Sequence, residues 1–489
     1  MISVQNLQPL LNGSKGLLFC CLLVFSLASC DSLKKVQKTP GADKGTGKDK
    51  TELEEIQGGK VFNPETGQFE DAVDASGQMD TVQWTEVPPE TAPPITSDAG
   101  NPIDGTRTGG TTEPGNVQSS YNVALLLPFL GNKFIDAANN IDAKSDLALH
   151  YYGGTKIAFD DLSTEGVQLN VSVFDTEASE AKTQTLLKRS ELAQANMIVG
   201  PVRRNNLRLT AAFAKQNGKV LVSPLSPSMQ ITNDNPYYVQ VNPSLKTHCE
   251  AITRHVLENH SRDEVVLVCR NKNAEVSRLK YFQEANTAIY GSTAVEKLQE
   301  FIITDQSADL NETDISPYIK EGKTTVFIVP SWSNESFVYS LMRKINIAKG
   351  LNQVVVYGMP QWMKFERAGL DYFEPLQVHI SSASNIDTDD PNVLAFRQRF
   401  FERYGMTPSV DAYVGYDVMM YFGRLLAKNG TQLNEVIDRE PAYGLHTYFS
   451  FSPNAPQSIN VENYSEVDYY ENKRVNILKF KDFYFQVAN

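Results

Sequence analysis

Three polar residues follow a glycine-proline turn, and they are the residues in this chain best suited to binding chemistry. Arg203, Arg204 and Asn205 come directly after Gly200-Pro201, where an apolar run ends and a helical segment begins. A guanidinium presents a planar fork that binds carboxylates or phosphates, and the backbone N–H groups at a helix start also favour an anion. The pattern predicts contact with an anionic ligand. The alternative is that both arginines are solvated and paired with local acids.

Other polar and aromatic residues stand where further apolar runs end. Ligands of open α/β sheets sit at the carboxyl ends of the strands, and aromatic side chains there supply contact area at low entropic cost. Packing inside the protein is the alternative for the tryptophans and the tyrosine. Together with the three residues above, the ligand-contacting candidates are Ser226, Ser331, Trp332, Gln361, Trp362 and Tyr413.

No catalytic constellation is present in the sequence. The chain has no Gly-x-Ser-x-Gly elbow, no phosphate-binding Walker loop, no His-Glu-x-x-His and no GxGxxG after a strand. Two of its six histidines, His248 and His255, are seven residues apart on one helical segment, too far to share a metal ion without other ligands. The sequence therefore predicts no catalytic residue, no metal site and no cofactor, and argues against an enzyme.

Length and charge narrow the class of protein. The 489 residues exceed what one hydrophobic core accommodates, since cores stop growing near roughly 250–300 residues, so more than one domain is expected. The net charge of −13 comes from 58 acidic and 45 basic residues, which argues against a nucleic-acid partner.

The N-terminus has the pattern of an export signal. Lys15 precedes an apolar run at 16–26, and small residues precede Cys30 in Leu-Ala-Ser-Cys. This last pattern resembles the lipobox of bacterial lipoproteins, which implies cleavage of residues 1–29 and lipidation of Cys30. The alternatives are an ordinary signal peptide or an N-terminal anchor. Residues 30–118 lack apolar periodicity and are rich in polar residues, glycine and proline, so we expect a disordered tether.

From about residue 121 the sequence alternates between apolar runs and amphipathic segments. Continuous apolar runs are typical of parallel strands buried on both faces, and their alternation with helices predicts an α/β fold with doubly wound, mainly parallel sheets. Two such series follow one another, so we expect two similar lobes. The predicted strands are 123–128, 167–174, 196–199 and 220–222, then 264–269, 299–303, 325–329 and 353–357, with later helices at 391–404 and 411–428.

Two cysteines remain in the expected folded part. Cys249 lies on a helical stripe, and Cys269 ends the following strand-like run. A helix that precedes a strand in an α/β unit runs antiparallel to it, so the two thiols could meet. A disulfide and two buried free thiols are equally open, because an oxidising compartment permits a disulfide.

The order of these pieces resembles the type I periplasmic-binding-protein fold, seen in branched-chain amino-acid-binding proteins. The segments that carry the resemblance are 124–128 (Ala-Leu-Leu-Leu-Pro), 173–176 (Val-Phe-Asp-Thr), 198–201 (Ile-Val-Gly-Pro), 222–227 (Val-Ser-Pro-Leu-Ser-Pro) and 413–417 (Tyr-Val-Gly-Tyr-Asp). The start of this part resembles Bacteroidetes-type envelope lipoproteins. The fold also resembles the receptor-like domain of an outer-membrane lipoprotein that activates a penicillin-binding protein.

The resemblance implies two lobes around a cleft, joined by three chain crossings near 242, 380 and 465. The first lobe is expected at 119–242 plus 381–464, and the second at 243–380 plus 465–489. Members that bind amino acids hold the ligand through a serine and a threonine, and Arg204 and Pro227 stand at those places here. This departure argues against a free branched-chain amino acid.

Two functions are compatible with this sequence. The first is an extracytoplasmic, lipid-anchored solute-binding protein of the ABC-transporter type, which closes its lobes on a small, anionic ligand. The second is a regulatory or scaffold lipoprotein that binds an envelope protein, such as a peptidoglycan synthase, for which a long tether is useful. Both place the chain in the bacterial cell envelope, held to the inner or outer membrane through Cys30.

Overall fold

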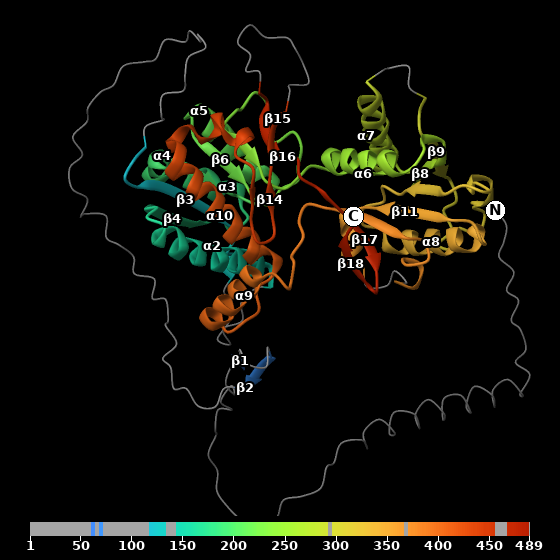
Figure 1. Cartoon of the computed structure of the whole chain (residues 1–489). Coiled ribbons are helices and arrows are strands. Elements are labelled where there is room, and N and C mark those ends of the chain that lie inside the picture. Colours follow the sequence, from blue (N-terminus) through green and yellow to red (C-terminus); the bar gives the residue numbers. More distant parts are fainter. Residues whose placement is uncertain are drawn as a thin grey trace, which may run out of the picture. The chain divides into compact units, whose positions relative to one another are not determined.

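Two seven-stranded sheets organise the part of the chain that the structure describes. The structure is a computed structural model (Figure 1), and it describes residues 60–63, 68–71, 117–133, 143–291, 296–365, 370–454 and 467–488. The expected signal peptide, Cys30 and nearly all of the tether lie outside these ranges. Two short strands, β1 (Lys60–Asn63) and β2 (Gln68–Asp71), form an antiparallel pair within the tether.

The first sheet has the strand order β15-β16-β7-β6-β5-β3-β4, and all its pairings are parallel except that of β15 with β16. Its strands come from both ends of the folded region. They are β3 (Tyr121–Leu127), β4 (Leu169–Asp175), β5 (Met197–Val199), β6 (Val220–Ser223), β7 (Tyr238–Gln240), β15 (Phe451–Asn454) and β16 (Tyr469–Asn472).

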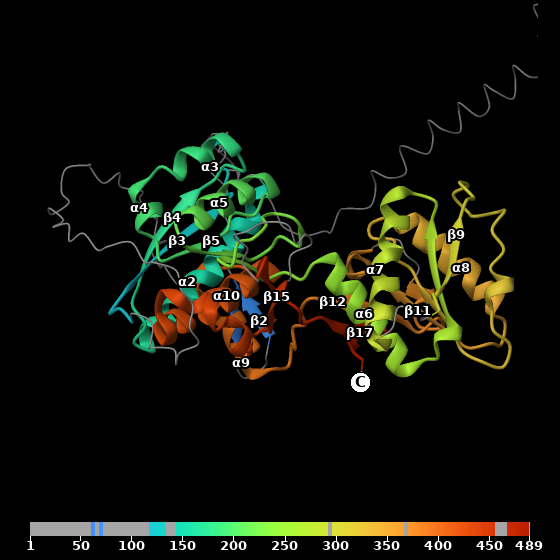
Figure 2. The same cartoon turned by 90° about the horizontal axis from the view of Figure 1, so that it is seen from above.

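Helices cover both faces of this sheet. On β3, Val123 and Leu125 enter one hydrophobic core while Ala124 and Leu126 enter another, as the alternation of side chains along a strand requires. Figure 2 shows α3 and α5 on one side of the strands and α2 and α10 on the other. The helices of this lobe are α2 (Asp146–Thr164), α3 (Glu180–Leu186), α4 (Ser190–Gln194), α5 (Arg204–Gln216), α9 (Pro391–Tyr404) and α10 (Val410–Asn429).

Helices α2 and α10 meet at glycines. A Cβ on Gly154 would lie 1.8 Å from the carbonyl oxygen of Ala412, and one on Gly415 would lie 2.1 Å from that of Tyr151. The two backbones therefore contact each other directly, which explains Gly154 and Gly415, whereas the neighbouring Gly153 faces the ring of Phe400 on α9.

The second sheet has the order β18-β17-β12-β11-β10-β8-β9, with β17 and β18 antiparallel to their neighbours and the other pairings parallel. Two mainly parallel sheets with helices confirm the predicted α/β fold. The strands are β8 (Val265–Arg270), β9 (Gln299–Ile303), β10 (Thr325–Ile328), β11 (Val354–Gly358), β12 (Val378–Ser382), β17 (Asn476–Lys481) and β18 (Tyr484–Val487), and the helices are α6 (Leu245–Asn259), α7 (Asn273–Tyr290) and α8 (Glu335–Lys349).

The chain passes between the sheets three times. It leaves the first sheet after β7, returns after β12, and leaves again between β16 and β17. The second passage comes after Ser382, close to the position near 380 expected from the sequence, and the third comes after Asn472, later than the position near 465. The reason for the third is that β16 still pairs with β7, Tyr470 opposite Val239.

Cys249 and Cys269 lie in the core of the second lobe as free thiols. Burial raises the pKa of both, to about 12 for Cys269. Of the two arrangements left open by the sequence, the structure thus has the two buried free thiols and not the disulfide.

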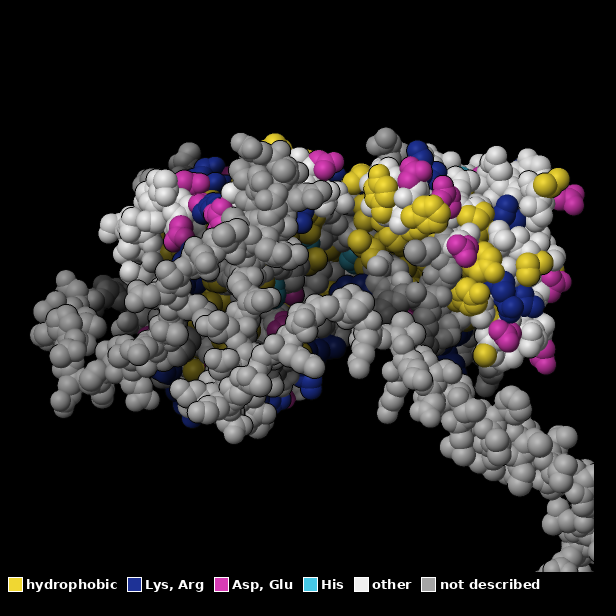
Figure 3. Space-filling model, turned by 90° about the horizontal axis from the view of Figure 1, so that it is seen from below, with side chains coloured by type: hydrophobic (Ala, Val, Ile, Leu, Met, Phe, Trp, Pro, Cys, Tyr) yellow, Lys and Arg dark blue, Asp and Glu magenta, His cyan; other side chains and the backbone are white. Residues whose placement is uncertain are grey.

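Some apolar side chains remain on the surface of the second lobe. Ile347 and Leu351 near the end of α8, and Phe483 and Tyr484 at the last hairpin, are more than half exposed. Figure 3 shows hydrophobic groups beside charged ones on this lobe. Within the described residues no helix has the length and apolar character to span a bilayer.

Candidate functional site

The arginines predicted to bind an anion lie at the start of α5 and are exposed. Arg204 donates from Nη2 to the carbonyl of Met229 at 3.3 Å, and Asn205 donates from Nδ2 to Glu180 Oε1 at 2.7 Å. The side chain of Arg203 makes no hydrogen bond or ion pair within the described residues, and only its backbone carbonyl accepts one, from the N–H of Leu207 at 2.8 Å. Two of the three side chains thus hold neighbouring segments of their own lobe, and Arg203 is the one left available for a ligand.

Two of the predicted contact residues in the second lobe lie in its interior. Ser331 is fully buried and donates from Oγ to Glu275 Oε1 at 3.2 Å. Trp362 is 1% exposed and donates from Nε1 to the carbonyl of Ser331 at 2.9 Å. Trp332 is partly buried and packs edge-on against His248, with ring centroids 6.4 Å apart. The structure brings Ser331 and Trp362 together, but as interior packing.

The other three predicted residues are also largely enclosed. Ser226 is 6% exposed and accepts the N–H of Ser228 at 3.3 Å, which stabilises the turn after β6. Tyr413 is 4% exposed and packs its ring against Phe396 at 4.8 Å. The side-chain oxygen of Gln361 is buried without a hydrogen-bond partner within the described residues. Of these three residues, Gln361 is therefore the one whose side chain has a buried oxygen that could still accept a hydrogen bond.

A pocket of about 300 Å³ opens in the second lobe where β8 and β9 end and α8 begins. Its position at the carboxyl ends of parallel strands is where such sheets hold ligands. The sequence predicts strands that end at 269, 303 and 329, but none of the residues that line this pocket was a predicted ligand-contacting residue. The polar lining residues are Arg270, Asn271, Lys272, Thr304, Asp305, Gln306, Ser307, Asn334 and Ser336.

The ion pairs in this pocket determine which of its charged side chains can bind a ligand. Glu275 is 3% exposed and accepts both the backbone N–H and Nε of Arg270, each at 3.0 Å, in addition to an ion pair with Nη2. The charge of Arg270 is therefore neutralised. The side chains of Lys272 and Gln306, both exposed, have no hydrogen bond or ion pair within the described residues. Lys272 is the free cation of this pocket.

The acid in the same pocket is occupied by its own loop. Asp305 accepts the N–H and hydroxyl of Ser307 at 2.8 and 2.7 Å, and the N–H of Glu312 at 2.8 Å. These hydrogen bonds, led by that of the Ser307 hydroxyl, lower the pKa of Asp305 to about 2. The carboxylate thus stays ionised but has little capacity left for a ligand, so the pocket favours an anionic group at Lys272.

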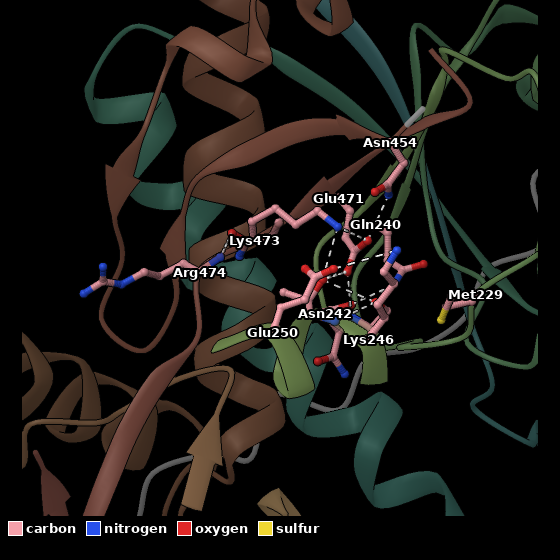
Figure 4. Close-up of polar contacts among 12 residues, drawn as sticks. Met229, Gln240, Asn242, Lys246, Glu250, Asn454, Glu471, Lys473 and Arg474 are labelled. Carbon is pink, nitrogen blue, oxygen red and sulfur yellow. Dashed lines mark hydrogen bonds and ion pairs between the residues drawn. The ribbon is translucent and has the colours of Figure 1, made fainter. Parts of the chain in front are cut away.

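A buried carboxylate joins the first and third passages between the sheets (Figure 4). Glu471 on β16 is 1% exposed and accepts the N–H of Ser244 and the hydroxyl of Thr247, each at 2.7 Å, at the start of α6. It also accepts Nδ2 of Asn454 at 2.9 Å and Nζ of Lys473 at 2.7 Å. Sequence reasoning missed Glu471, because a lone acid in a short polar strand gives no signal of burial.

An ion pair and hydrogen bonds stabilise the ionised form of the buried Glu471 side chain. Burial alone would raise its pKa, but the Lys473 ammonium, the Thr247 hydroxyl and the Ser244 N–H together hold the pKa below its usual range. Nearby His248 is 3% exposed, and burial lowers its pKa to about 4, opposed by the charge of Glu471. The hinge therefore contains an ionised carboxylate and a neutral imidazole near pH 7.

These features define a class of protein. Two mainly parallel α/β sheets, three passages of the chain between them and a polar pocket at strand ends describe a two-lobed binding protein. Within the described residues no cluster of three acids, histidines or cysteines is suited to hold a metal ion.

The chain belongs to the periplasmic binding protein family, whose model matches residues 147–438. It is a binding protein and not an enzyme. A comparison with curated protein sequences found no match.

Solved structures agree with this fold. A putative branched-chain amino acid ABC transporter protein from Rhodospirillum rubrum is 12% identical with a TM-score of 0.53, covering 75% of this chain and 99% of its own. A periplasmic ligand-binding protein of a branched-chain amino acid ABC transporter from Burkholderia xenovorans is 11% identical with a TM-score of 0.51, covering 76% and 95%. An ABC transporter substrate-binding protein from Desulfitobacterium hafniense is 16% identical with a TM-score of 0.50, covering 76% and 100%. At these identities the likeness concerns the fold.

Proposed function

We propose that this protein is an extracytoplasmic solute-binding protein of the ABC-transporter type that binds a small molecule carrying a carboxylate or another anionic group. The observation that carries the proposal is the pocket after β8 and β9, in which Lys272 is an unpaired cation. A ligand's anionic group would pair with Lys272, and its polar remainder would meet Asn271 and Gln306. Family membership supports a binding role of this kind.

The expected mechanism is a hinge motion that closes the two lobes on the ligand. Glu471 and its partners lie at two of the three passages of the chain, so a bending motion would pivot about this network. Arg203, exposed at the start of α5, is the first-lobe group best suited to meet the same anion.

We also propose that the protein is held at a bacterial membrane by lipid on Cys30. The Leu-Ala-Ser-Cys pattern after an apolar run supports this proposal. Fractionation of cells tests it: the wild-type chain is expected with the membranes, and a Cys30→Ala variant is expected to leave that fraction. Membrane association that survives Cys30→Ala would refute lipidation at this residue.

The binding proposal is tested by titrating the purified protein with amino acids, short peptides, nucleotides and peptidoglycan fragments in a thermal-shift assay. We expect an anionic compound to raise the melting temperature. Lys272→Gln should weaken its binding about 10- to 150-fold, as expected for losing a hydrogen bond to a charged group. Lys280→Gln is the matched control, because Lys280 is exposed on α7 and pairs with Glu284.

Two outcomes would overturn this assignment. Binding that Lys272→Gln leaves unchanged would place the ligand outside the second-lobe pocket. Silence of the whole library, with both variants folded by circular dichroism, would favour the alternative of a regulatory lipoprotein that binds an envelope protein.

A further inference from the structure

A second cavity, of about 540 Å³, lies in the first lobe beside α10. One wall is α10 and the other is the segment 440–449, which contains the two-stranded pair β13 (Ala442–Tyr443) and β14 (Tyr448–Phe449). None of the strand-end residues of the proposed solute site lines it. The proposed solute site therefore does not account for this cavity.

A buried acid fixes the two walls together. Asp417 on α10 is 1% exposed, and its carboxylate accepts the N–H groups of Leu445 at 2.7 Å and of His446 and Thr447 at 2.8 Å each. A Cβ on Gly444 would lie 2.4 Å from the Asp417 carboxyl carbon, so only glycine allows this approach. The contact thus fixes the segment 440–449 against α10.

Aromatic rings line part of this cavity. Tyr421 stacks on Phe449, with ring centroids 4.3 Å apart, inside the cavity. Tyr443 is 80% exposed, and its ring rests on that of Tyr448 at 4.0 Å. A large exposed ring that is held by a second ring offers a flat apolar face to a ligand at little entropic cost.

The two cations at the rim are paired with acids. Arg424 forms a bidentate ion pair with Glu165, and Lys428 pairs with Glu440 at 2.6 Å. Asp390 at the same rim has no cation bonded to it within the described residues and accepts the N–H of Asn392 at 2.6 Å. No cation is left in excess, so the rim does not favour an anion. It offers carboxylates, a guanidinium and an amide, which suit groups that both donate and accept hydrogen bonds.

From this combination we propose that the first-lobe cavity binds a neutral sugar ring of an oligosaccharide, stacked on Tyr443 and hydrogen-bonded by its hydroxyls to the rim. The C–H face of a sugar fits a tyrosine ring. Its hydroxyls donate to Asp390 and Glu440 and accept from Arg424. This site is separate from the second-lobe pocket and does not depend on the function proposed for it.

Saturation-transfer NMR of the intact protein with maltotriose, cellotriose and triacetylchitotriose tests the proposal. At least one trisaccharide is expected to bind and to receive saturation chiefly at the C–H groups of one ring. Tyr443→Ala should weaken that binding about tenfold or more, whereas Tyr443→Phe, which keeps the ring, should retain it. Tyr484→Ala is the control, because Tyr484 is an exposed tyrosine of the other lobe.

Absence of binding by all three trisaccharides would overturn the proposal. Binding that persists unchanged in a folded Tyr443→Ala variant would also overturn it, because the sugar would then lie elsewhere. Lys272→Gln should leave trisaccharide binding unaltered, so failure of the sugar site and failure of the solute site give different results.

Discussion

Replacement of Glu471 by alanine removes the one acceptor shared by four donors at the hinge. These donors lie at the start of α6, on β15 and on the short segment between β16 and β17, so the carboxylate connects segments that are far apart in the sequence. Without it, the Ser244 N–H and the Thr247 hydroxyl stay buried and the Lys473 ammonium loses its counter-ion. We therefore expect Glu471→Ala to destabilise the whole folded part.

The expected loss of stability in Glu471→Ala follows from the burial of the ion pair that Glu471 forms with Lys473. The side chains of Glu471 and Lys473 are 2% and 28% exposed, so the pair is mostly shielded from water. Removing one partner of a buried ion pair costs about 3–5 kcal/mol. In domains the size of these lobes, each kcal/mol shifts the melting temperature by about 2–4 °C, so a decrease of roughly 6–20 °C is expected.

Differential scanning calorimetry at pH 7 measures this decrease. Glu250→Ala is the matched control, because Glu250 lies on α6 near the same network but is 35% exposed and pairs with Lys246 at 3.8 Å. An exposed pair of this kind contributes at most about 1 kcal/mol. A double variant, Glu471→Gln with Lys473→Met, should recover part of the loss, since it removes both charges. Melting of Glu471→Ala within 2 °C of the Glu250→Ala control would refute the reasoning.

Two further predictions concern acid and thiol chemistry. Because the folded-state pKa of Glu471 is lowered, its contribution to stability is present above its unfolded pKa, near 4.5, and is lost as the pH falls through the folded pKa. Urea denaturation between pH 7 and pH 3 should therefore show a shallower loss of stability in Glu471→Gln than in wild type, and equal slopes would contradict this assignment. Cys249 and Cys269 should resist iodoacetamide in the native protein and react in urea, as read from their peptides by mass spectrometry; a disulfide would leave both unreactive in urea without a reductant.

The parallel strands could be predicted from the sequence because burial on both faces makes them continuously apolar. The runs at 123–128 and 264–269 illustrate this relation, and helices between them follow from the connections that parallel strands require. The strand β16 (Tyr-Tyr-Glu-Asn) has no such pattern, since its acid and amide are satisfied by distant partners. Its place in the first sheet depends on tertiary contacts, which the hydrophobic periodicity of the sequence does not predict.

The sequence indicates strand ends as candidate binding positions, and a pocket of the structure lies at the ends of β8 and β9. Which side chains line such a pocket could not be predicted, because the sequence does not give the direction in which a side chain points. Trp362 turns inward because Gly358 leaves room for its ring, and Tyr413 joins the packing around Phe396. Likewise, the sequence does not show which cation of the pocket can pair with a ligand. Lys272 is that cation, since Glu275 neutralises the charge of Arg270.

Strands within residues 451–487 complete both sheets. Strands β15 and β16 close one edge of the first sheet, and β17 and β18 close one edge of the second. During synthesis from the N-terminus, neither lobe has all of its strands until β15 to β18 have been made. A product that stops before about residue 450 lacks edge strands in both lobes, so a nonsense or frameshift mutation shortly before this point should abolish the native protein and not leave a functional first lobe.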